Sequence, residues 1–183
     1  MGKRSVILTG SPRKTDNTPP LDRAFREGAE RAGHTVAEFF LGDREIHGCR
    51  GCFGGRSGRE CPCVQRDGMA DIYPAVRESD VLVLASPLYY WTVSGQLKTA
   101  IDRLFALEEG DGNLLRGHGR ASALLMAAEG YGFEDALAYY DHLMDHLQWR
   151  NLGHVLACGV MDVGDIQGRQ ELEEARALGA SIT

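Results

Sequence analysis

The sequence has no long hydrophobic run. Of its 183 residues, 43% are hydrophobic, but no apolar stretch approaches the roughly 20 residues that a membrane-spanning helix needs. The apolar run near the N-terminus covers only Val6 to Leu8, which is shorter than the core of a secretory signal peptide. We therefore expect a protein with no membrane segment, located in the cytoplasm.

The sequence also lacks an excess of positive charge. It contains 20 Lys and Arg against 26 Asp and Glu, a formal net charge of -6, which argues against a surface for nucleic acid or anionic lipid. Two nucleotide-binding signatures are missing as well: the GxxxxGK(S/T) loop of triphosphatases and the GxGxxG turn of dinucleotide-binding proteins. We expect neither of those two sites.

Short apolar runs instead alternate with helical patterns along the chain. The pattern predicts strands at residues 5–10, 34–41, 80–87, 120–130 and 153–161, and helices at residues 21–33, 69–79, 94–107, 133–149 and 168–182. Such alternation is typical of a parallel sheet with helices on both faces. We therefore expect an α/β fold in a single domain, residues 1–183.

Details of these segments place them in the sheet. The runs at 80–87 and 120–130 are apolar on both faces, as buried strands of a parallel sheet are, whereas 34–41 alternates and fits a strand nearer an edge. Pro74 interrupts its helical pattern, so that helix is expected to kink or to start late. Residues at about 42–68 are rich in Gly, Arg and Cys and predict a long loop.

The first predicted crossover carries groups that suit an anion. Between the apolar run and the helix stands GSPRKTDNT, residues 10–18, which supplies hydroxyl, amide and basic groups. The candidate ligands are Ser11, Arg13, Lys14, Asn17 and Thr18. The start of the helix adds backbone N–H groups and a positive dipole end, so a phosphate monoester fits this turn.

Two prolines weaken that prediction. Pro19 and Pro20 have no N–H to offer to a phosphate. An ordinary capped turn remains the alternative, with Thr18 as the N-cap and Pro19 as the first helical residue.

Three consecutive aromatic residues follow the predicted third strand. Tyr89, Tyr90 and Trp91 lie at the edge of the sheet where ligands of such folds bind. Rings on a loop at that edge suit stacking against a flat ligand. The alternative is that they cap the core or line a subunit interface. With the phosphate turn, they outline a ligand with a phosphate at one end and a planar ring at the other, which FMN matches.

The segments GSPRKTDNT and SPLYYWTVSGQLKTAIDRL together resemble the flavodoxin-like NAD(P)H-dependent FMN reductase family, including its iron–sulfur flavoprotein relatives. The resemblance implies a three-layer sandwich with a five-stranded parallel sheet in the order 2-1-3-4-5. It also implies residues that contact FMN. These are Ser11, Arg13, Asn17 and Thr18 at the phosphate, Pro87, Leu88, Tyr89, Tyr90 and Trp91 along the ribityl chain and ring, and Glu129 and Gly130 at the ring's other edge.

The same resemblance implies an activity. NADPH or NADH would pass hydride to the flavin, and the flavin would reduce a small-molecule acceptor such as a quinone, a nitro or azo compound, or free flavin. The flavin carries the chemistry, so we assign no catalytic side chain. A homodimer or higher homo-oligomer is implied too. Two alternatives remain: an electron carrier of the flavodoxin type without nicotinamide turnover, and a non-redox binding protein that kept only the fold.

The predicted loop contains four of the five cysteines. Iron–sulfur relatives use a CxxCxxC run followed by a fourth cysteine, but here Gly55 stands at the third position. The candidate ligands of a cluster or a zinc ion are Cys49, Cys52, Cys61 and Cys63. Because of this departure we expect no iron–sulfur cluster and favour a structural or substrate-side loop with reduced or loosely paired thiols.

Overall fold

The computed structural model describes residues 2–55, 61–109 and 112–183. Its sheet is parallel, with the strand order β2-β1-β3-β4-β5 that the resemblance implied. The strands are β1 (Arg4–Thr9), β2 (Thr35–Phe40), β3 (Val81–Pro87), β4 (Ala121–Ala127) and β5 (Arg150–Ala157). The α/β flavodoxin-like fold is therefore confirmed.

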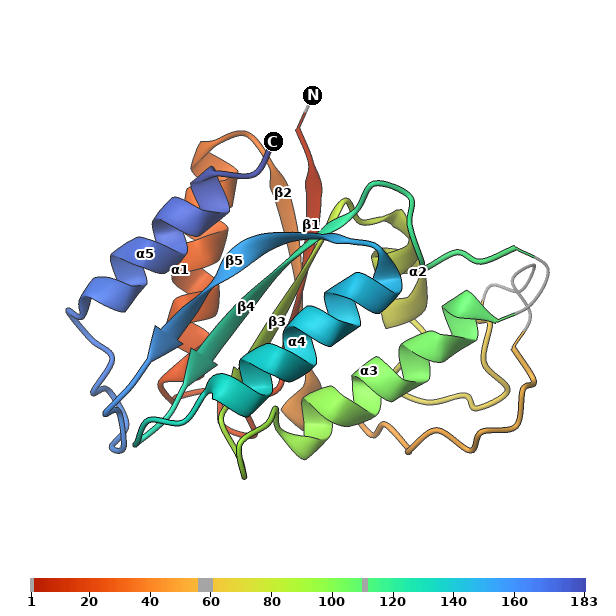
Figure 1. Ribbon diagram of the computed structural model, residues 1–183, viewed down its shortest axis with the longest axis horizontal. Coiled ribbons are helices and arrows are strands. Elements are labelled where there is room, and N and C mark those ends of the chain that lie inside the picture. Colours follow the sequence, from red (N-terminus) through yellow and green to blue (C-terminus); the bar gives the residue numbers. More distant parts are fainter. Residues whose placement is uncertain (1, 56–60, 110–111) are drawn as a thin grey trace.

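Helices cover both faces of the sheet (Figure 1). They are α1 (Thr18–Arg31), α2 (Ile72–Glu78), α3 (Gly95–Glu108), α4 (Glu134–Leu147) and α5 (Gln170–Ala180), with a short 3-10 turn η1 (Leu41–Asp43) after β2. In Figure 1, α1 and α5 lie side by side on one face, and α2, α3 and α4 lie on the other. Among the described residues, none of these helices is long and apolar enough to cross a bilayer.

The core has two halves because successive side chains of a strand point to opposite faces. On β1, Val6 and Leu8 pack against α2, α3 and α4, whereas Ile7 packs against α1 and α5. Every residue of β3 and β4 is buried, as the apolar runs predicted. The alternating segment became the edge strand β2, also as predicted.

The element boundaries differ from the sequence prediction at several places. Helix α1 begins at Thr18, so Thr18 is the first helical residue rather than the N-cap; Asn17 is the N-cap, and its side chain does not cap the helix. Strand β5 begins three residues early, at Arg150. Helix α2 begins at Ile72, which puts Pro74 in its first turn and confirms the late start.

Candidate functional site

A cleft of about 290 Å³ opens where β1, β3 and β4 end at the carboxyl edge of the sheet. This is the edge at which parallel α/β sheets bind their ligands. The cleft is lined by Arg13, Asp16, Asn17, Thr18, Pro87, Leu88, Tyr89, Ala127, Ala128, Glu129, Val160 and Met161. The structure thus brings the predicted phosphate turn and the predicted aromatic loop to one cavity.

Buried hydrogen bonds lock the first two loops of the cleft together. Ser94 Oγ donates to the Gly10 carbonyl at 2.7 Å, and the Gly10 N–H donates to the Ala85 carbonyl at 2.7 Å. Ser86 Oγ in turn accepts the Ser94 N–H at 2.8 Å. A Cβ at Gly10 would lie 2.7 Å from Ser94 Oγ, so only glycine allows this approach.

The phosphate turn presents one buried hydroxyl that has no partner. Thr18 is fully buried, and its Oγ1 makes no hydrogen bond in the described part of the chain. It lies at the first residue of α1, whose own N–H has no partner within the helix. Pro19 and Pro20, which follow, have no N–H to add. Ser11 differs, because its Oγ already accepts the Arg13 N–H and donates to the Arg13 carbonyl.

Asn17 holds the turn in place. Its amide donates to the Asp162 carbonyl at 3.0 Å and accepts the Ile166 N–H at 3.2 Å. These bonds join the start of α1 to the segment after β5, which brings Val160 and Met161 to the cleft. The contribution of Val160 and Met161 to the cleft was not predicted, because no local sequence pattern links residues 145 positions apart.

Both cations of the turn have carboxylate partners. Arg13 pairs with Asp16, at 3.2 Å from Nε and 3.0 Å from Nη2 to Oδ2. Lys14 pairs with Asp43 and lies over the Phe40 ring, and it does not line the cleft. Both charges were predicted to attract an anion, but Asp16 and Asp43 neutralise them.

The aromatic loop is a tight, strained turn. The Tyr89 N–H donates to the Thr92 carbonyl at 2.9 Å, and the Thr92 N–H donates back to Tyr89 at 3.1 Å. Between them, Tyr90 and Trp91 have φ values of 47° and 62°, a left-handed conformation that bulky residues rarely adopt. Tyr90 is 91% exposed and Trp91 59% exposed. Strain of this kind gathers at functional sites.

The remaining predicted residues divide between the wall and the outside of the cleft. Pro87, Leu88 and Glu129 line it with Tyr89. Four of the residues predicted to contact FMN are not part of the lining: Ser11, Tyr90, Trp91 and Gly130. The Leu88 N–H donates to the Ala127 carbonyl at 3.0 Å. This bond holds the aromatic loop against the end of β4.

A buried carboxyl group lies one turn below Thr18 in α1. Asp22 accepts a hydrogen bond from Thr9 Oγ1 at 2.7 Å, while its Oδ1 has no partner among the described residues. Burial, and then the Glu38 carboxylate, raise the pKa of Asp22 to about 8, although the Thr9 hydrogen bond opposes the shift. The native state therefore holds a proton that the unfolded state releases near pH 4.

Stability should thus fall as the pH rises from about 4 to about 8, because the native state binds more protons over that range. We expect Asp22→Asn to raise the melting temperature, and to raise it more at pH 8 than at pH 5. Thermal unfolding of both proteins at the two pH values measures this. A variant that melts lower than the parent at pH 8 would contradict the buried neutral carboxyl.

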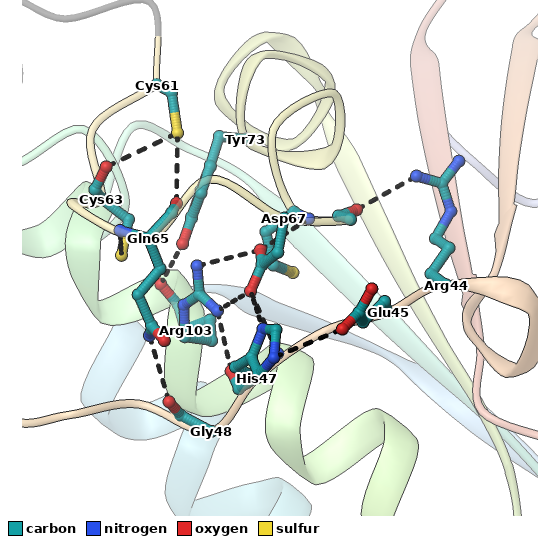
Figure 2. Close-up of polar contacts among 12 residues, drawn as sticks. Arg44, Glu45, His47, Gly48, Cys61, Cys63, Gln65, Asp67, Tyr73 and Arg103 are labelled. Atoms are coloured by element: carbon teal, nitrogen blue, oxygen red, sulfur yellow. Dashed lines mark hydrogen bonds and ion pairs between the residues drawn. The ribbon is translucent and has the colours of Figure 1, made fainter.

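A buried ion pair joins the Cys-rich loop at about residues 42–68, called here the cysteine loop, to helix α3 (Figure 2). Arg103 of α3 contacts both oxygens of Asp67, at 2.6 and 3.1 Å, and donates to the His47 carbonyl at 2.7 Å. Asp67 also accepts the N–H groups of His47 and Met69. Both charged side chains are almost fully buried, and sequence patterns did not reveal this contact.

The cysteines do not form a ligand set in the described residues. Cys49 and Cys52 are exposed, whereas Cys61 and Cys63 are buried. Cys61 Sγ hydrogen-bonds to backbone carbonyls of its own loop, and Cys63 Sγ accepts the Gln65 N–H (Figure 2). In residues 2–55, 61–109 and 112–183, no three His, Cys, Asp or Glu side chains are placed to hold a metal.

The strand order and the cleft at the carboxyl edge of the sheet are those of a flavodoxin-like α/β protein. The sequence profile of the NADPH-dependent FMN reductase family matches residues 4–163, and the chain belongs to this family. An iron-sulfur flavoprotein of Archaeoglobus fulgidus is 34% identical over 182 residues, which cover 98% of this chain and 78% of that protein.

Solved structures show the same fold. An NAD(P)H:quinone oxidoreductase from Methanothermobacter marburgensis superposes with a TM-score of 0.72 at 18% identity, covering 100% of both chains. An FMN-dependent NADH-azoreductase from Bacillus anthracis superposes with a TM-score of 0.68 at 16% identity, covering 97% of this chain and 98% of the other. At such identities the likeness concerns the fold.

Proposed function

We propose that FMN binds in the cleft, with its phosphate at the start of α1 and its ring against residues 87–91. One observation carries the proposal: the buried Thr18 hydroxyl without a partner, at a helix N-terminus that faces the cleft. A buried polar group without a partner is costly, and a phosphate oxygen would satisfy it. The apolar and aromatic wall opposite suits a flat ring.

When bound, FMN supplies the two-electron redox chemistry. The residues of this chain bind and orient it. The N–H and hydroxyl of Thr18 would hold the phosphate, since Pro19 and Pro20 after it have no N–H. Tyr89 and Trp91 would pack on the ring, and Leu88 and Glu129 would lie at its edges. No side chain is assigned a proton transfer.

The proposed activity is an FMN-dependent oxidoreductase that takes electrons from NADPH or NADH. It passes them to a quinone, a nitro or azo compound, or free flavin. Family membership supports the activity. The structural neighbours include a quinone oxidoreductase and an azoreductase, which supports quinone and azo compounds as acceptors. We also propose a homodimer or higher oligomer, which the exposed Tyr90 and Trp91 beside the cleft support.

Two measurements test this function. Adding FMN to anaerobically purified protein should shift the absorption bands of the flavin as it binds, and the protein alone should lack the broad absorption of an iron–sulfur cluster. Steady-state oxidation of NADPH or NADH with a quinone should then show turnover. Bound FMN without turnover would contradict the reductase activity and favour an electron carrier. The net charge of -6 suits such a carrier, because an acidic surface can dock redox partners.

The substitution Thr18→Val tests directly whether the buried Thr18 hydroxyl binds the phosphate. Because the hydroxyl has no protein partner, its loss should leave the flavin-free protein as stable as the parent or slightly more stable. A lost hydrogen bond to a charged group is worth about 1.5–3 kcal/mol, so we expect FMN to bind tenfold or more weakly. Flavin fluorescence titrations measure this, with riboflavin as the control ligand, since it lacks the phosphate. Equal weakening of both flavins would contradict the assignment.

A further inference from the structure

The charge of the cleft is unusual for a phosphate site. Its lining contains one cation, Arg13, and two carboxylates, Asp16 and Glu129. The other cation of the turn, Lys14, is paired with Asp43 away from the cleft. At the phosphate turn Asp16 thus offsets the charge of Arg13, and with Glu129, which the proposed binding mode places at the ring, the described lining has a net charge of one negative unit.

Of the two carboxylates, Asp16 is the one that contacts the cation of the phosphate turn. Its side chain is 6% exposed, whereas that of its partner Arg13 is 57% exposed. Its Oδ2 accepts from Arg13 Nε and Nη2 and lies 3.5 Å from Ser11 Oγ. Asp16 therefore occupies the guanidinium of Arg13, the cation predicted to bind the phosphate.

A phosphate entering this turn meets two opposing effects. It must compete with Asp16 for the Arg13 guanidinium, and it is repelled by a carboxylate that solvent screens poorly. The hydrogen bonds offered by Thr18 and by the backbone favour the phosphate. The balance between these effects sets the affinity.

We infer that Asp16 is an affinity-determining residue that acts as an internal counter-anion and limits the binding of the flavin's phosphate end. The inference rests on the proposed function and deepens it. FMN then exchanges with solution rather than remaining permanently bound, and the site distinguishes FMN from riboflavin only weakly.

Asp16→Asn tests the inference because it removes the charge and keeps the shape. FMN titrations monitored by flavin fluorescence should show binding at least tenfold tighter than in the parent. Riboflavin affinity should change less than twofold, since riboflavin has no phosphate to repel. The dissociation rate of FMN should fall in proportion.

Asp43 of η1 offers a matched control, because it pairs with Lys14, the other cation of the phosphate turn. Asp43→Asn makes the same change of charge and frees Lys14, but outside the cleft. We expect it to change FMN affinity less than twofold. The double variant Asp16→Asn with Arg13→Gln should lose most of the gain, because the released guanidinium supplies it.

The outcomes separate the inference from the function on which it rests. Unchanged or weaker FMN binding by Asp16→Asn, or equal tightening of riboflavin, overturns the role of Asp16 while leaving the flavin site intact. If neither flavin binds to the parent or to any variant, the proposed function fails and the inference with it. Should Asp16→Asn fail to fold, Asp16→Ala makes the same test.

Discussion

Replacing Arg103 with methionine is expected to lower the free energy of unfolding by about 3–5 kcal/mol. The substitution keeps most of the length and apolar surface of the side chain but leaves Asp67 buried without its counter-charge. It also leaves the His47 carbonyl without the guanidinium that binds it. Breaking a buried pair from one side is far more damaging than losing an exposed one, because the remaining charge has been taken out of water.

The pH dependence of Asp67 offers an independent check. Burial by itself would raise its pKa, but hydrogen bonds from Arg103 and from the N–H groups of His47 and Met69 outweigh burial and lower the pKa to about 2. A depressed pKa stabilises the fold above the unfolded value near 4, and that contribution disappears as the pH falls through 2. The stability difference between the parent and Asp67→Asn should shrink over this acidic range.

Urea unfolding at neutral pH measures the Arg103 effect. Arg4→Met is the matched control, since it removes the same group from the exposed Arg4–Glu78 pair, and we expect about 0–1 kcal/mol there. Equal effects of the two substitutions would show that the Arg103–Asp67 contact does not hold the cysteine loop.

The second large effect concerns the turn that carries Tyr90 and Trp91. The paired substitutions Tyr90→Asn and Trp91→Gly place in this turn the residues that best adopt two consecutive left-handed conformations. We expect the flavin-free protein to gain about 1–2 kcal/mol of stability from released backbone strain. FMN affinity should nevertheless fall by tenfold or more, because the aromatic surface for the ring is lost.

Gln148→Gly is the control for the double substitution, which is expected to raise stability while lowering FMN affinity. Gln148 caps α4 with a φ of 56°, so glycine there should also relieve strain, but far from the cleft lining. Its thermal stability should rise while its FMN affinity stays at the parent value. If the double substitution in the aromatic turn left FMN affinity intact, these rings would not be part of the binding surface.

The sheet could be predicted from sequence because each strand carries its own signal. β3 and β4 are apolar on both faces, and β2 alternates, so their places in the sheet follow from local patterns. The strand order came from the resemblance. Helix α1 was predicted from residue 21 but begins at Thr18, and the alternative with Thr18 as the N-cap was wrong. The N-cap is Asn17, whose side chain binds the distant segment after β5 and so gives no local capping signal.

The site was predicted in outline for a similar reason. Parallel strands bring their carboxyl ends to one edge, so two loops with suitable side chains had to meet there. The pairing of Arg13 with Asp16, and of Arg103 with Asp67, depends on where long side chains lie in three dimensions. Residues three or thirty-six positions apart carry no periodic signal of such contacts.

A crystal structure of the protein grown with FMN tests the central claim most directly. We predict flavin density at the carboxyl edge, with the phosphate at residues 11–18 beside Thr18 and the ring against Tyr89 and Trp91. A larger apolar groove of about 530 Å³ lies elsewhere, between α3 and α4, and reaches Leu82 and Leu84 of the sheet. Flavin bound in that groove, with the carboxyl-edge cleft free of it, would contradict the account.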